Sequence, residues 1–146
     1  SQRRLVAAKI VSTEKPKQIQ DSLRPFLLRE LSHPEGLIRL SELAHQGPED
    51  ALVRYLFARQ LEQLGLCVRG LPETKTALTG NLPSPDFYKE AVLMKGRMTL
   101  CTGQYKEAQA HFQRLVDSST RAVDQLMAQE WKMRARIRSE SPMILE

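Results

Sequence analysis

The 146-residue chain is 41% hydrophobic, 27% charged and 5% aromatic, and it carries a formal net charge of +5. Its length suits one domain that buries roughly two-thirds of its unfolded surface, and its composition excludes intrinsic disorder and a membrane-spanning run of roughly 20 apolar residues. Because aromatic residues are few, the core must consist mainly of Leu, Ala, Met and Val, which favours an all-α fold.

The N-terminal part of the chain divides in two. Residues 1–15 are basic and show no clean apolar period, so we expect a tail or an irregular first helix. Over residues 19–31 an apolar side chain recurs every four positions, which predicts a helix that Pro25 kinks or begins. The expected organisation is the basic segment, a single helical domain at 16–138 and a tail at 139–146. In that tail, Leu145-Glu146 resembles a vector scar.

Two helices are predicted next. Ser32 and Glu35 have capping-box spacing at the start of the first helix, which ends at Gly47-Pro48. The second helix carries Glu49-Asp50 in its first turn, near the positive end of the helix dipole, and Gly65 ends it. Its predicted core face consists of Leu52, Val53, Leu56, Phe57, Leu61 and Leu64.

Gly70 and Pro72 interrupt the following segment, for which only a short helix at residues 72–78 is predicted. Ser84-Pro85-Asp86 then supplies a hydroxyl cap, a first-turn proline and an early carboxylate, in the order of a helix start. This helix is expected to continue until Gly103. Its predicted core face consists of Phe87, Ala91, Met94, Met98 and Cys101.

The last two helices are predicted at residues 105–116 and 121–138, separated by a turn. The core face of the first consists of Tyr105, Ala108, Phe112 and Leu115. Met127 is also expected in the core, whereas the place of Trp131 stays open. Since no stretch alternates apolar and polar residues between hairpin turns, no sheet is predicted. The expected fold is six to seven helices stacked as antiparallel pairs.

A pattern of small and aromatic residues in the second half of the chain carries a family resemblance. Its members are, in order, Gly96, Gly103, Tyr105, Ala108 and Phe112. This order resembles the centre of a tetratricopeptide repeat, in which two helices cross closely at a small residue, a glycine makes the turn and aromatic side chains fill the space between repeats. The resemblance implies an α-solenoid of stacked helix pairs.

Several positions depart from the family pattern. Thr99 stands where the family has a large aromatic residue, and Lys95 stands where it has leucine. Gly65 and Gly103 lie further apart than the family's period of about 34 residues, which predicts an inserted loop near residues 82–85. The resemblance is therefore specific to one repeat.

The resemblance also implies a function. Proteins of this family hold peptides, helices or extended segments on a concave face lined by the first helix of each repeat. We therefore expect a non-catalytic scaffold or adaptor that binds protein, and positive groove residues favour an acidic segment. The candidate contact residues lie on the first helices, outside the core faces: Arg54, Arg59, Lys95, Arg97, Thr99, Gln129 and Lys132.

Two other interpretations stay open: a helical accessory module of a larger enzyme or secretion assembly, and a basic nucleic-acid-binding module. Positive charge does gather at residues 1–17 and 132–138. However, Arg134, Arg136 and Arg138 alternate along the chain, which spreads them around a helix, and the basic runs lack interleaved aromatic residues that would stack on bases. Nothing in the sequence indicates the oligomeric state.

No pattern predicts a catalytic site, a cofactor or a metal ion. The histidines His33, His45 and His111 lie far apart in the sequence, which argues against a shared metal site. No nucleophile elbow or glycine-rich phosphate loop is present in the sequence. His111 is expected to be a partly exposed helix residue and not a base.

The two cysteines, Cys67 and Cys101, belong to no CxxC pattern and to no cysteine-histidine cluster. Unpaired cysteine is among the most buried residue types, so we expect two small buried side chains instead of a redox motif. Because disulfides are rare in reducing compartments and common in oxidising ones, two unpaired cysteines favour a cytoplasmic location.

Overall fold

The computed structural model describes residues 33–46 and 50–140, and within them the chain is all-α, as predicted, with no strand. The helices are α3 (His33–Gln46), α4 (Ala51–Gln63), α5 (Cys67–Thr79), α6 (Pro85–Cys101), α7 (Tyr105–Ser118) and α8 (Ala122–Glu140). The expectations for residues 1–32, for the boundary at 47–49 and for the tail at 141–146 lie outside the described residues.

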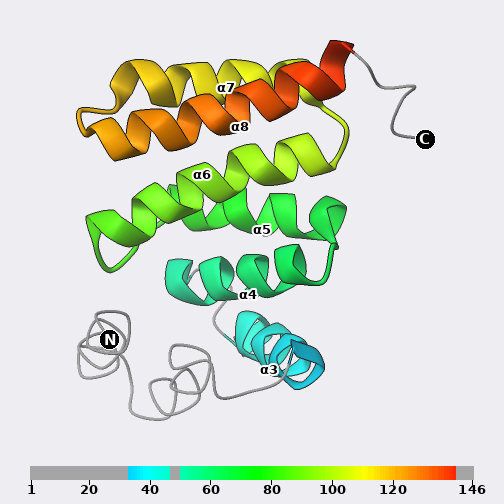
Figure 1. The fold of residues 1–146 in the computed structure, drawn as a ribbon. Coiled ribbons are helices and arrows are strands. Elements are labelled where there is room, and N and C mark those ends of the chain that lie inside the picture. Colours follow the sequence, from blue (N-terminus) through cyan, green and yellow to red (C-terminus); the bar gives the residue numbers. More distant parts are fainter. Residues whose placement is uncertain (1–32, 47–49, 141–146) are drawn as a thin grey trace.

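Consecutive helices pack against each other in antiparallel fashion, from α3 to α8. The middle helix, α6, also contacts α4 and α8. Figure 1 shows the helices as a stack, with α3 at one end, the pair α7 and α8 at the other end, and α4, α5 and α6 between them. α6 therefore contacts four other helices and connects the two ends of the stack.

Glycine turns end α4 and α6, as the sequence predicts. Gly65 has a φ of 75° and Gly103 a φ of 87°, in the left-handed region that glycine adopts without the steric penalty of a Cβ. After Gly65, the Leu66 amide donates to the Leu61 carbonyl at 2.8 Å, and the equivalent bond after Gly103 measures 3.2 Å. These bonds close the two helix ends and fix where the next helix starts.

Side-chain caps set the starts of α4 and α6. The carboxylate of Asp50 accepts from the amides of Leu52 and Val53 at 3.0 and 3.3 Å, so Asp50 precedes α4 and does not lie in its first turn as predicted. Ser84 accepts from the Phe87 amide at 3.4 Å, as its place before a proline suggested. Each cap satisfies amides that the first helical turn leaves without a partner.

The helix α5 begins earlier than predicted and contains Pro72 in its interior. Five buried residues at helical spacing explain why packing outweighs the poor helix propensity of this segment; they are Cys67, Gly70, Leu71, Thr74 and Ala77. At Gly70, an added Cβ would lie only 2.9 Å from the Met98 Cε and 3.2 Å from the Leu61 Cβ. Gly70, which disfavours a helix locally, therefore lies where α5 closely approaches α4 and α6.

The hydrophobic core follows the predicted faces with three exceptions: Leu64, Cys101 and Met127. A large cluster joins α3, α4, α5 and most of α6, and a smaller one joins the end of α6 to α7 and α8. Leu64 is 37% exposed because it caps the end of α4, and Met127 is 44% exposed because the buried face of α8 consists of Ala128 and Ala135. The expectation that these three side chains belong to the core is wrong.

The cysteines form a disulfide, Cys67–Cys101, with the Cα atoms 6.0 Å apart. It joins the start of α5 to the end of α6, and only Cys67 is buried. The expectation of two unpaired buried cysteines is therefore wrong. The two cysteines lie close together only because α5 stacks on α6. No local sequence motif could therefore predict that they pair. The cytoplasmic expectation loses its main support with this pairing.

Candidate interaction site

The seven predicted contact residues do not form one positive groove, and Arg97 shows why. Its guanidinium donates from Nε and Nη2 to the Glu62 carboxylate of α4, both at 2.8 Å, and it lies 3.6 Å from Glu90. Burial alone would lower the pKa of Arg97, but the hydrogen bond and charge of Glu62, with a smaller contribution from Glu90, raise it. On its other side, Arg97 lies 5.9 Å from the ring centre of Trp131 in α8.

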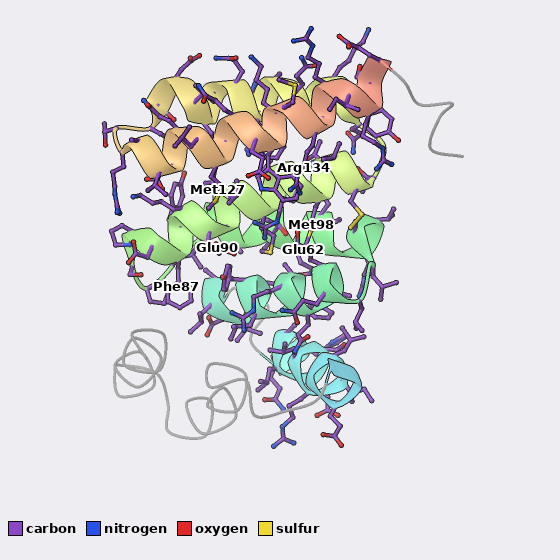
Figure 2. All side chains as sticks on the ribbon, viewed as in Figure 1. Glu62, Phe87, Glu90, Met98, Met127 and Arg134 are labelled. Carbon is purple, nitrogen blue, oxygen red and sulfur yellow. A yellow bond between two sulfur atoms is a disulfide. The ribbon has the colours of Figure 1, made fainter. Side chains whose placement is uncertain are left out.

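Arg97, on α6, therefore connects α6 with α4 through Glu62 and with α8 through Trp131. Figure 2 shows Glu62 of α4 and Arg134 of α8 on either side of α6. Trp131, whose place the sequence left open, stacks on Phe112 with ring centres 6.1 Å apart and also carries the guanidinium of Arg134 at 4.5 Å. The positive charge of Arg97 is neutralised within the fold, so it is not available to attract an acidic partner.

Most of the other predicted contact residues are also engaged. Arg54 forms a 2.6 Å ion pair with Glu73 of α5, and Arg59 lies over the ring of Tyr55 at 5.9 Å. Thr99 is 4% exposed, and its hydroxyl donates to the Lys95 carbonyl. Lys132 donates to Gln113 of α7, and Gln129 is exposed. Thr99 is thus not accessible to a partner, and Arg54 and Lys132 turn toward different helices, α5 and α7.

The residues that carry the family resemblance lie where α6 meets α7. Gly96 is buried, and a Cβ added to it would lie 2.5 Å from the Phe112 Cε1 and 2.6 Å from the His111 Cδ2. Ala108 and Phe112 are fully buried, and Tyr105 is half-buried beneath Arg138. The close helix crossing that the sequence predicts at Gly96 is present, with the rings of the second helix packed against the glycine.

His111 is buried, not partly exposed as predicted, because the crossing at Gly96 encloses it. Its Nε2 donates to the Val92 carbonyl of α6 at 2.8 Å. Burial lowers the pKa of His111, the bond to Val92 opposes this, the positive charges of Lys95 and Arg114 lower it further, and Glu107 opposes them. The folded protein therefore holds this imidazole in its neutral form.

The burial of His111 predicts acid sensitivity. Unfolding frees the imidazole to titrate near its ordinary value of 6.5, whereas the folded state binds the proton only at lower pH. As the pH falls below about 6.5, the unfolded state gains the proton first, so the free energy of unfolding decreases. Urea titrations measure the free energy of unfolding at about pH 7.5 and pH 5.5. Between these two pH values it should fall by more in the wild type than in His111→Gln. Equal losses in the two proteins would contradict this explanation.

A cleft of about 500 Å³ lies between α6 and α8, next to the end of α7. Its apolar lining consists of Val92, Leu93, Leu115, Met127 and Ala128, with Tyr88 at the edge. Figure 2 shows Met127 of α8 and Glu90 of α6, which both line the cleft. None of the seven predicted contact residues lines it.

The charged residues of the cleft are mainly acidic. Asp86, Glu90 and Asp124 line it together with a single basic residue, Lys89. Lys89 donates to Asp124 at 3.3 Å and so spans the cleft from α6 to α8, with both side chains at least one-third exposed. Asp86 was predicted only as part of a helix start, and no sequence pattern singled out Lys89, Glu90 or Asp124. Tyr88, a large aromatic residue outside the core face of its helix, was the available signal.

Comparisons with protein-family models, curated proteins and solved structures found no match to this chain. In residues 33–46 and 50–140, no helix is long and apolar enough to cross a membrane. Over the same residues, no group of three or more histidine, cysteine, aspartate or glutamate side chains is placed to hold a metal ion.

Proposed function

We propose that the chain is a protein-interaction scaffold that binds a segment of a partner protein in the cleft between α6 and α8. The observation that carries this proposal is a cleft of about 500 Å³ with an apolar lining and exposed apolar side chains at its edge. Met127 is 44% and Tyr88 is 52% exposed, and side chains of this size gain free energy when a partner removes them from water. The volume suits a few side chains of a peptide.

The chemistry of the cleft favours a segment with apolar and basic residues. Three carboxylates and one ammonium group line the cleft, and Arg97 lies near only one of the carboxylates, Glu90. A lysine or arginine of the partner would therefore add a missing positive charge near Asp86 and Asp124. The ion pair of Lys89 with Asp124 is partly exposed and contributes little to stability, so an incoming cation can replace Lys89. The acidic partner expected from the sequence suits this cleft poorly, because three of the four charged residues that line it are carboxylates.

The disulfide supports an oxidising compartment in place of the cytoplasm. Disulfides form and persist outside the reducing cytosol, and this one joins two helix ends of the stack. The scaffold is therefore expected to meet its partner in such a compartment. Mass spectrometry of the protein isolated from its own cells, with free thiols alkylated before lysis, would test this location through the redox state of Cys67 and Cys101.

Selection from a random peptide library displayed on phage tests the docking function. We expect enriched peptides that combine an apolar residue with lysine or arginine. Tyr88→Lys, which replaces an exposed apolar residue of the cleft with a positive charge, should weaken their binding at least about tenfold, or about 1.4 kcal/mol. Binding would be measured by fluorescence anisotropy with the synthesised peptides.

Ile38→Lys is the matched control for this experiment. Ile38 is 63% exposed on α3, at the other end of the stack, so the same change of chemistry occurs far from the cleft. Selected peptides should bind Ile38→Lys as tightly as the wild type. Peptides that bind Tyr88→Lys without loss, or a selection that yields acidic sequences, would refute the proposed docking site.

A further inference from the structure

The outer side of α8 exposes an unusual amount of apolar surface. Ten large hydrophobic side chains are exposed among the described residues, and five of them lie on this one helix. They are Val123, Leu126, Met127, Met133 and Ile137, with exposed fractions of 53%, 65%, 44%, 52% and 53%. Scattered apolar residues on a surface need no explanation, but a concentration on one helix indicates a contact surface.

The spacing of these residues makes a stripe along the helix. Val123, Leu126, Met133 and Ile137, with Glu130 at the centre, alternate steps of three and four residues. At about 100° per residue this pattern keeps all five on one side of α8. The buried Ala128 and Ala135 lie on the opposite side, so the stripe points away from the core. We call Val123, Leu126, Glu130, Met133 and Ile137 the α8 stripe.

Positive charge borders the stripe. Arg134 and Arg136 are 53% and 55% exposed, and each forms an ion pair one turn away on the same helix, with Glu130 and Glu140. Arg134 also lies over the ring of Trp131. Exposed pairs of this kind contribute little to stability, so both arginines can exchange their carboxylates for those of a partner. The α8 stripe is therefore an apolar row with basic residues beside it.

A second copy of this chain fits the stripe poorly. In an antiparallel arrangement centred on the stripe, Glu130 would face its own symmetry mate, which is unfavourable. Arg136 would face the N-terminal half of the other α8, where the residues on the same edge of the stripe, Ala122, Gln125 and Gln129, offer no carboxylate. Asp124 is at the level of Arg136 but lies on the side of the helix away from the stripe, where it pairs with Lys89. In a parallel arrangement the arginines would face each other. The charges call for a partner that carries acidic residues along its own apolar row.

We propose that the α8 stripe binds an amphipathic helix of another protein whose apolar face is bordered by aspartate or glutamate. This surface is separate from the cleft of the proposed function, because the stripe residues do not line that cleft. The geometry is that of two helices packed side by side, with apolar residues between them and opposite charges along the edges. The acidic partner that the sequence suggested thus fits α8 and not the predicted groove.

Two synthetic helical peptides with the same leucine row test the proposal. One carries glutamate and the other lysine at the positions beside the row, and both are titrated against the intact protein by fluorescence anisotropy. We expect the glutamate peptide to bind at least about tenfold more tightly than the lysine peptide. Leu126→Lys should abolish binding of the glutamate peptide, whereas Tyr88→Lys, in the cleft, should leave it unchanged.

A variant that misfolds would also lose binding, so the test includes a variant that is expected to bind more tightly. Glu130→Leu completes the apolar row and frees Arg134 from its ion pair, so it should bind the glutamate peptide several-fold more tightly than the wild type. Equal binding of the two peptides, or no gain with Glu130→Leu, would overturn the proposal. So would a dimer, seen by sedimentation, that Leu126→Lys dissociates, because the stripe would then be occupied by a second copy.

Discussion

Reduction of the Cys67–Cys101 disulfide should lower the free energy of unfolding by about 3 kcal/mol. The bond joins residues 34 positions apart and closes a loop that contains α5 and α6. In the chain-entropy account, a loop of this length restricts the unfolded state by about 3 to 4 kcal/mol, and measured values often fall somewhat lower. Urea unfolding with and without a reducing agent, followed by circular dichroism, measures the difference.

Cys101→Ser separates the loop closure from the loss of buried side chains. Cys101 is exposed, so a serine hydroxyl at this position should change the free energy of unfolding little. The variant should therefore have the same free energy of unfolding as the reduced wild type. A reducing agent should have no further effect on the variant. If the oxidised and reduced proteins unfold at the same urea concentration, the stacking of α5 on α6 would hold without the bond, and the preference for an oxidising compartment would lose its physical basis.

The helices that the sequence predicted well are those whose ends carry local signals. Gly65 and Gly103 require the left-handed conformation that stops a helix, and Ser84 caps the next one through its own side chain. Such signals depend on a few neighbouring residues and are present in the sequence itself. Within the described residues, the order of the helices could therefore be predicted without knowledge of their packing.

The errors arise where contacts distant in sequence decide the outcome. Gly70 and Pro72 disfavour a helix locally, yet α5 forms because its buried face fits against Leu61 and Met98. The Cys67–Cys101 pair similarly depends on the stacking of α5 and α6, which no local pattern encodes. Propensity is a weak term, and packing of a complete apolar face outweighs it.

The candidate site was the least predictable part for the same reason. A basic residue on a first helix appears available for binding until its partner is known. For Arg97 that partner is Glu62, which lies 35 positions away in the sequence. For Arg54 it is Glu73, which lies 19 positions away. The cleft itself is formed by residues of three helices, so it exists only once α8 is packed beside α6.

Gly96→Ala should lower the free energy of unfolding by about 2 kcal/mol, although alanine is the better helix former. In an exposed helix the substitution would stabilise the protein by about 1 kcal/mol. Here the new methyl group would lie 2.5 Å from Phe112 and 2.6 Å from His111, two buried rings in the contact between α6 and α7. Rings enclosed in this way cannot move aside without opening the core, and overpacking of this kind costs about 1 to 3 kcal/mol.

Gly70→Ala is the matched control, since both glycines are buried within helices and both approach another helix closely. The nearest atom to a Cβ at Gly70 is the Met98 Cε, at the end of a flexible thioether chain that can change rotamer. The Leu61 Cβ, at 3.2 Å, needs to shift by only a few tenths of an ångström. This variant should therefore stay within about 1 kcal/mol of the wild type. If Gly96→Ala is as stable as Gly70→Ala, the α6–α7 crossing tolerates a side chain. The resemblance to a helix repeat would then lose its central residue.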